Sequence, residues 1–315
     1  MCCQVAEFSI ASHEFPAVVF VNPHAGGGRA RRCLSPIKRI FAERSFPAEF
    51  IFTESTEALE SHARRAIQAG QRVLLAMGGD GTLQALVNAA HGHDVVLGIL
   101  PAGGGNDFAV ALGLPKNPIA AATASLSAKP RLVDLLRART ADGRRRLYVG
   151  GGGVGLDADA ARYSGGAYAR LPGRLRYIAA ALRALREFKP LQVRAEFPRS
   201  EIPAMDAQVL LAGVLNTPSY GAGLRLAPDN RIDDGLLTTL FVKNLSAAEV
   251  LAVVPRLLTR GDLPSSHVTR AFAPRVRLTT DRECFFHGDG EILGCAPVEI
   301  EVLPNAARML TPVTT

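Results

Sequence analysis

The chain has 315 residues, which is long for a single typical domain and favours two, and its hydrophobic fraction of 48% is ample for a sizeable core. The formal net charge of +7 predicts acidic partners, such as phosphates or an anionic membrane surface. The lack of Trp and the aromatic fraction of only 6% argue against a nucleic-acid stacking platform, so no nucleic-acid partner is expected.

The first half of the chain alternates apolar strands with glycine-rich turns and helices. Residues 17–21 predict a buried strand, which is followed by a turn containing Asn22 and three glycines at 26–28. Residues 49–53 alternate like a strand and lead to a helix near 59–69. Residues 95–100 predict a further strand, followed by a third glycine turn with Asn106 and Asp107 and then another helix.

The central stretch of this half is Gly78-Gly79-Asp80-Gly81-Thr82. It follows a short, partly β-branched apolar run at 73–77 and precedes residues 83–90, whose apolar positions have helical spacing. In such a strand-to-helix turn, glycines let the backbone approach a ligand, and free N–H groups face a bound anion. Taken alone, the motif fits equally an ordinary turn in which Asp80 caps the helix.

Three glycine turns at one edge of a sheet are more specific than any one of them. The recurring order of strand, turn and helix predicts a doubly wound parallel sheet with its ligand crevice at the carboxyl ends of the strands. None of the turns matches a P-loop, and the dinucleotide-binding GxGxxG pattern is absent. Backbone amides would therefore hold phosphate, with Asp80 and Asp107 available for Mg²⁺.

The sequence changes character after residue 137. Residues 139–146 are polar and basic, as expected of a hairpin tip or linker. Short candidate strands then follow at 147–149, 191–197, 207–215, 236–242, 275–280 and 297–303. We expect a nucleotide domain at 1–137, to which 304–315 return, and a second, mainly antiparallel β domain at 138–303 with one helical excursion.

The helical excursion covers residues 175–188, and eight basic residues but one acid, Glu187, lie between Arg162 and Arg194. A basic amphipathic helix can lie on anionic lipid. A helix packed on the β domain with a solvated basic face fits the same pattern. The apolar positions with one-face spacing are Leu175, Ile178, Leu182 and Leu185.

The five cysteines form no CxxC pair and are odd in number, which argues against a zinc knuckle or a disulfide framework and favours a reducing cytoplasm. No run approaches the ~18 to 20 apolar residues of a membrane span, and the N-terminus lacks a signal-peptide pattern. We therefore expect a cytoplasmic protein that associates with membranes only peripherally.

Taken in order, these motifs resemble the diacylglycerol kinase catalytic-domain family, which includes bacterial diacylglycerol and other lipid kinases and the sphingosine kinases. The resemblance extends from about residue 18 to 304. NAD kinases and, more loosely, 6-phosphofructokinases share the GGDG element. The distal matches at 153–158, 228–237 and 289–291 therefore distinguish the diacylglycerol kinase family from these two. The implied fold is α/β plus β: a doubly wound domain like that of NAD kinase and phosphofructokinase, with an antiparallel β-sandwich domain.

The resemblance also implies residue roles. Glu291 would be the general base that takes the proton of a substrate hydroxyl, with Asp289 assisting or binding Mg²⁺. Asn22 and Asn106 would shape the ATP crevice. The implied nucleotide-binding set is Asn22, Thr53, Gly78, Gly79, Asp80, Gly81, Thr82, Gly104, Asn106 and Asp107.

A second, structural Mg²⁺ site is implied in the loop 231–236, where Asp234 would supply a carboxylate and Arg231 and Leu236 backbone carbonyls. A tight Asp-Gly turn without metal is the alternative. The chain also departs from the family pattern. Gly104 replaces a usual Thr, and Gln84-Ala85 replaces Asn-Glu, which removes a hydroxyl and a carboxylate from the nucleotide end.

The sequence as a whole predicts an ATP-dependent, Mg²⁺-assisted lipid kinase. ATP would bind the first domain, and the β domain would hold a lipid alcohol such as diacylglycerol at an anionic membrane surface, with the active site between the domains. A soluble-substrate kinase of the NAD kinase type and a nucleotide sensor without turnover are the alternatives. An oligomer is compatible with the sequence, and diacylglycerol, sphingoid bases, ceramide-like and isoprenoid alcohols all present a hydroxyl on an apolar body.

Overall fold

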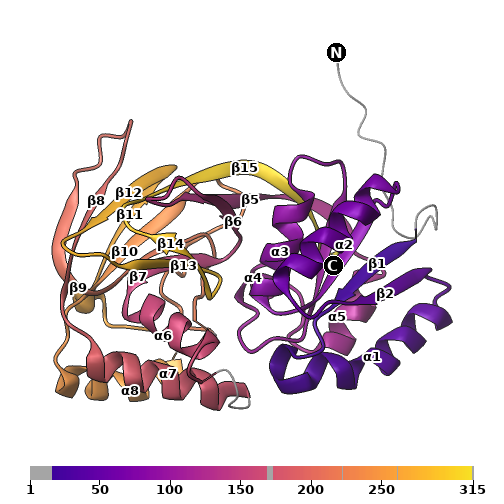
Figure 1. Cartoon of the computed structure of the whole chain (residues 1–315), viewed down its shortest axis with the longest axis horizontal. Helices are drawn as coiled ribbons and strands as arrows, with labels where there is room; N and C mark the ends of the chain where they lie inside the picture. Colours follow the sequence, from indigo (N-terminus) through magenta and orange to yellow (C-terminus); the bar gives the residue numbers. More distant parts are fainter. Residues whose placement is uncertain (1–15, 169–172, 222, 261, 314–315) are drawn as a thin grey trace. The chain divides into compact units, whose positions relative to one another are not determined.

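The computed structural model describes residues 16–168, 173–221, 223–260 and 262–313. The chain divides into two compact units (Figure 1), one of residues 1–133 with 305–315 and the other of residues 134–304. It passes from unit 1 to unit 2 within β5 (Lys129–Arg139) and returns within β15 (Val298–Thr311).

Unit 1 contains a parallel sheet of β1 (Ala17–Val21), β2 (Ala48–Phe52), β3 (Val73–Gly78) and β4 (Val96–Pro101), with the end of β15 added beside β4. The spatial order β2-β1-β3-β4 reverses direction between β1 and β3. At such a switch point the loops leave the sheet on opposite sides, which opens a crevice at the carboxyl ends of the strands.

Helices cover both faces of this sheet. Alternate residues of β1 and β3, such as Val19 and Leu75, pack on Ile37 and Phe41 of α1. Their neighbours Val18 and Leu74 point the opposite way and are also buried. The doubly wound arrangement predicted from the sequence is therefore confirmed. Its helices are α1 (Ala25–Glu43), α2 (Thr56–Gln68), α3 (Asp80–Ala90), α4 (Asp107–Ala111) and α5 (Pro118–Ser125).

Unit 2 is a mainly antiparallel β domain, as predicted. β9 is long enough to pair with β8 over its first half, with β7 over its second half and with β10 on another edge, and this pairing joins the strands around one apolar core. Besides β5 and β15, its strands are β6 (Arg145–Tyr148), β7 (Gly151–Gly155), β8 (Leu191–Glu196), β9 (Met205–Leu215), β10 (Leu237–Lys243), β11 (Val268–Ala273), β12 (Arg275–Thr280), β13 (Phe285–Gly288) and β14 (Glu291–Cys295).

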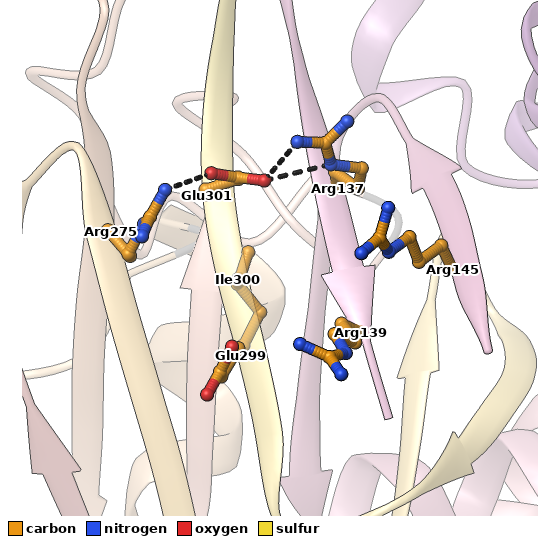
Figure 2. Close-up of a pocket in the computed structure, with 7 residues that line it drawn as sticks. All are labelled: Arg137, Arg139, Arg145, Arg275, Glu299, Ile300 and Glu301. Atoms are coloured by element: carbon orange, nitrogen blue, oxygen red, sulfur yellow. Dashed lines mark hydrogen bonds and ion pairs between the residues drawn. The ribbon is translucent and has the colours of Figure 1, made fainter. Parts of the chain in front are cut away.

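The segment 139–146, predicted as a hairpin tip or linker, contains the turn of a hairpin at residues 140–144, between the end of β5 and the start of β6. Glu301 in β15 joins this hairpin to β12, because its carboxylate accepts hydrogen bonds from Arg137 of β5 and Arg275 of β12 (Figure 2). Burial by itself raises the pKa of Glu301, but the two guanidinium groups outweigh burial and lower it.

The expectation of a single helical excursion in the second domain is wrong, because α6 (Leu156–Gly165) and α8 (Ala247–Arg260) accompany α7 (Gly173–Glu187). The sequence also gave no sign of β7, whose residues are Gly-Gly-Gly-Val-Gly. Tertiary packing explains these glycines, since a Cβ atom on Gly152 would lie 2.2 Å from the carbonyl oxygen of His287 on the paired strand β13.

Helix α7 is the predicted basic excursion, but its apolar residues do not share one environment. Leu185 packs on the cluster around Leu210 and Leu215, whereas Leu182 is 63% exposed. The side chains of Leu175 and Ile178 lie outside the described residues. Among the helices that the structure describes, none is long and apolar enough to cross a bilayer.

Candidate active site

The structure brings the three glycine turns of unit 1 together at the carboxyl ends of β1, β3 and β4. A Cβ atom on Gly26 would lie 2.1 Å from the carbonyl oxygen of Ala102, and one on Gly103 would lie 2.5 Å from Cα of Gly79. Gly26 also has φ +59°, which other residues adopt only with strain. The glycines therefore permit a backbone-to-backbone approach that side chains would block.

Asp80 connects the second turn to the third. It begins α3, and its two carboxylate oxygens accept hydrogen bonds from the backbone N–H groups of Asp107 and Phe108, each at 3.3 Å. Asp80 thus caps α4, the helix of the neighbouring turn, rather than its own helix. Burial, and then the charge of Asp107, raise the pKa of Asp80 to about 6 from its usual 3.8.

This shift predicts a pH dependence of stability for the ligand-free protein. Folded Asp80 binds its proton more tightly than unfolded Asp80, so its stabilising contribution is present below pH 3.8 and is lost as the pH rises through about 6. The difference between these two pKa values corresponds to at most about 3 kcal/mol of folding free energy. It corresponds to about 2 kcal/mol once the partial exposure of Asp80 is allowed for.

Asp80→Asn should therefore become more stable relative to wild type by about 2 kcal/mol between pH 4 and 8. The hydrogen bond that the amide cannot accept adds a cost that does not vary with pH. Urea titrations at several pH values measure the difference, and Asp94→Asn, at a side chain 76% exposed, serves as control. A pH-independent difference for Asp80→Asn would contradict the assignment.

Among the remaining predicted nucleotide residues of unit 1, Asn22, Thr82 and Asn106 hold the turns in shape. The Asn22 amide lies 3.4 Å from the Thr82 hydroxyl, which joins the first turn to the second. Asn106 adopts a left-handed conformation and exchanges two hydrogen bonds with the backbone of Gly103. Thr53 is buried at the end of β2, where its hydroxyl donates to the Val21 carbonyl at 3.4 Å. Gly104 is exposed and Gly78 is buried.

The predicted acidic residues Asp289 and Glu291 lie in unit 2, on the hairpin between β13 and β14. Asp289 and Gly290 have φ values of +53° and +87°, as in the two-residue turn that an Asp-Gly pair favours. The Asp289 carboxylate accepts hydrogen bonds from Val149 and Gly150, both at 2.8 Å, and from Gly151 at 3.3 Å. Asp289 is therefore held by backbone, whereas Glu291 is exposed at the start of β14.

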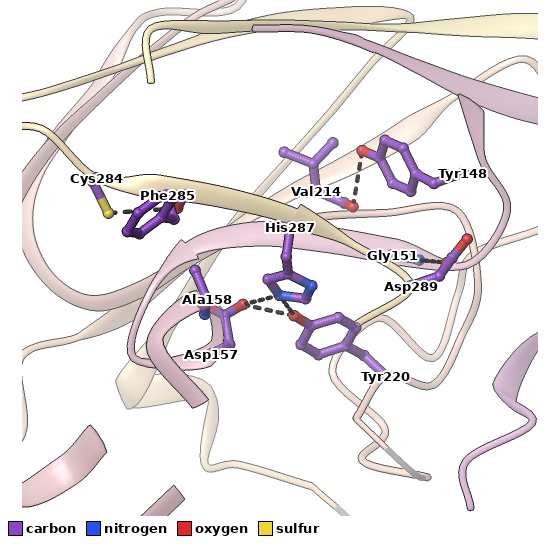
Figure 3. Close-up of polar contacts among 10 residues, drawn as sticks. All are labelled: Tyr148, Gly151, Asp157, Ala158, Val214, Tyr220, Cys284, Phe285, His287 and Asp289. Carbon is purple, nitrogen blue, oxygen red and sulfur yellow. Dashed lines mark hydrogen bonds and ion pairs between the residues drawn. The ribbon is translucent and has the colours of Figure 1, made fainter. Parts of the chain in front are cut away.

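A buried polar cluster that no sequence pattern indicated is formed by Asp157, Tyr220 and His287 (Figure 3). The Tyr220 hydroxyl donates to Oδ2 of Asp157 at 2.6 Å and lies 2.6 Å from Nε2 of His287. Burial, and then the charge of Asp157, raise the pKa of Tyr220 well above its usual value, so the phenol stays protonated. His287 is on β13, two residues before Asp289, and a lone Tyr or His gives no sequence signal for such a cluster.

The predicted metal loop is also in unit 2. Oδ1 of Asp234 accepts a hydrogen bond from the Leu236 N–H at 3.0 Å, and the buried Asp134 carboxylate accepts one from Gly235 at 2.7 Å. Within the described residues, no group of three or more His, Cys, Asp or Glu side chains could hold a metal ion. A carboxylate oxygen with backbone carbonyls is the kind of ligand set that Mg²⁺ prefers, so a structural Mg²⁺ site in this loop stays a prediction.

Comparison with known proteins relates this arrangement to one family. The family model described as "Diacylglycerol kinase catalytic domain" matches residues 16–138. The family model described as "YegS C-terminal NAD kinase beta sandwich-like domain" matches residues 152–311. A diacylglycerol kinase of Mycobacterium tuberculosis is 30% identical over 95% of this chain and 96% of its own length. The chain belongs to the diacylglycerol kinase family. It is a lipid kinase, and membership implies ATP as a substrate.

Further relatives agree with this family assignment. A diacylglycerol kinase of Bacillus subtilis is 26% identical over 94% of this chain and 96% of its own length. A crystal structure of a diacylglycerol kinase from Bacillus anthracis superimposes with a TM-score of 0.69, at 19% identity, over 95% of this chain and 97% of that one. At this identity the likeness shows a shared fold, with the α/β and β-sandwich domains that the sequence predicted.

Proposed function

We propose that this lipid kinase transfers the γ-phosphate of ATP to the hydroxyl of a lipid alcohol such as diacylglycerol, with Glu291 as general base. The observation that carries the proposal is the convergence of three glycine turns around Asp80 in a chain of this family. Backbone N–H groups and a helix N-terminus suit phosphate, and Asp80 and Asp107 are available for Mg²⁺.

The proposed mechanism divides the work between the two units. The turns of unit 1 bind and orient the phosphates of ATP, and Mg²⁺ neutralises charge when bound. Glu291 of unit 2 takes the proton of the lipid hydroxyl as its oxygen attacks the γ-phosphorus, and ADP leaves with the electrons of the broken P–O bond. Asp289 assists through its three bonds to residues 149–151, which fix the turn that carries Glu291.

Peripheral binding to an anionic membrane is part of the proposal, because the lipid substrate is costly to remove from a bilayer. The net charge of +7 and the exposed Leu182 on α7 support it. Arg183 on the same helix is already paired with Glu187 at 3.0 Å and stacks on Tyr163, so it contributes little free charge.

An assay with purified protein, radiolabelled ATP, Mg²⁺ and mixed vesicles tests the proposal. We expect a phosphorylated lipid when diacylglycerol or a related alcohol is present, and a rate that rises when anionic lipid is added. Phosphorylation of a soluble metabolite regardless of vesicles would instead favour the NAD kinase type. ATP binding without turnover on any acceptor would favour a nucleotide sensor, consistent with Gly104 and Ala85 at the nucleotide end.

A further inference from the structure

A cavity of about 170 Å³ opens on unit 2 where β12, β15, β5 and β6 lie side by side (Figure 2). It has room for on the order of ten water molecules. Its lining is charged throughout apart from Ile300, and it shares no residue with the glycine turns or the acidic turn. The charged lining residues are Arg137, Arg139, Arg145, Arg275, Glu299 and Glu301.

The strand registers explain why these charges share one face. Side chains two apart on a strand point the same way, which groups Arg137 with Arg139 and Glu299 with Glu301. Arg145 is directly opposite Arg139 in the β5–β6 pair, and Arg275 is directly opposite Glu301 in the β12–β15 pair. Four arginines and two glutamates give the cavity a formal charge of +2.

The charges are not matched evenly across the cavity. Glu301 is bonded to both Arg137 and Arg275, which leaves Arg139, Arg145 and Glu299 at the other end. In the part of the chain that the structure describes, no carboxylate pairs with the guanidinium of Arg139 or Arg145. Like charges directly opposite on paired strands are destabilising, so the ligand-free hairpin holds two cations together at a cost.

A guanidinium group presents a planar fork of N–H donors that matches the oxygens of a phosphate. A phosphate monoester carries a charge of about −1.5 to −2 near neutral pH, close to the opposite of the cavity's own charge. We propose that this cavity binds the phosphate group of an anionic ligand, with Arg139 and Arg145 as its principal contacts. The ligand is a soluble phosphate ester or an anionic phospholipid headgroup, and the proposal is independent of the reaction proposed above.

Two binding measurements distinguish a soluble phosphate from a phospholipid headgroup as the ligand. Isothermal titration with inorganic phosphate and pyrophosphate measures the soluble form, and sedimentation with phosphatidylcholine vesicles, with or without phosphatidic acid, measures the lipid form. In at least one of these measurements, the double variant Arg139→Gln/Arg145→Gln should bind the phosphate ligand at least tenfold more weakly than the wild-type protein does. Arg199→Gln/Arg225→Gln removes the same charge from exposed positions elsewhere in unit 2 and should change binding less than twofold.

Each outcome is decisive. If the double variant loses binding only to inorganic phosphate and pyrophosphate, the site is assigned to a soluble phosphate. If it loses binding only to phosphatidic acid vesicles, the site is assigned to a lipid headgroup. If wild type binds neither, or if the control loses as much as Arg139→Gln/Arg145→Gln, the proposal is wrong. Thermal denaturation without ligand shows that the variant is folded, and its midpoint should equal or exceed that of wild type because the like-charge pair is gone.

Discussion

Glu291→Gln should lower the turnover number by about 10²- to 10⁴-fold, the usual contribution of a positioned general base. The substitution keeps the size of the side chain and removes its ability to take a proton. Because Glu291 is exposed at the start of β14, the free energy of unfolding should change by less than about 0.5 kcal/mol. The KM for ATP should stay within about twofold, since the nucleotide turns belong to unit 1.

Steady-state kinetics at saturating lipid, together with a thermal melt, measure both effects. Glu201→Gln is a suitable control because it makes the same change at an exposed position of the same unit and should retain full turnover. Wild-type turnover should also decline at acidic pH as the base becomes protonated, and Glu291→Gln should lose that decline. Unchanged turnover in Glu291→Gln would assign the base to another residue.

Replacing Asp289 should affect stability more than any other change in the acidic turn. Asp289→Gly introduces a residue that tolerates φ +53° and removes the whole side chain, which leaves the N–H groups of Val149, Gly150 and Gly151 without their acceptor. Orphaning three backbone donors should cost about 3 to 5 kcal/mol. Asp289→Asn retains one acceptor oxygen and should cost less than half as much.

Hydrogen exchange read by mass spectrometry locates the effect, since the amides of residues 149–151 should lose protection in Asp289→Gly. Urea unfolding of unit 2 gives its size. The exposed Asp229 provides the control Asp229→Gly, which should leave protection at 149–151 intact. Asp289→Asn distinguishes a metal role: a KM for Mg²⁺ that rises tenfold or more, with protection at 149–151 intact, would show that Asp289 binds the ion in addition to the backbone.

The sequence predicted most of unit 1 because its elements carry local signals. A buried parallel strand such as β1 is a continuous apolar run, and glycines mark the turn that follows it. Unit 2 was harder. β7 contains four glycines and carries little local signal of a strand. It is a strand because β9 and β13 pair with it, and their backbones leave no space for side chains at Gly152 and Gly153.

The amino-acid sequence by itself determined the family, the doubly wound domain and the positions of the glycine and acidic motifs, because these depend on short runs of residues. Only the tertiary structure decided which distant groups meet. Asp80 caps a helix 27 residues away, and Asp289 holds a backbone segment about 140 residues away. Arg139 lies opposite Arg145 in a cavity that β12 and β15 also line. Such contacts depend on strand register and on the packing of distant segments, which local periodicity does not encode.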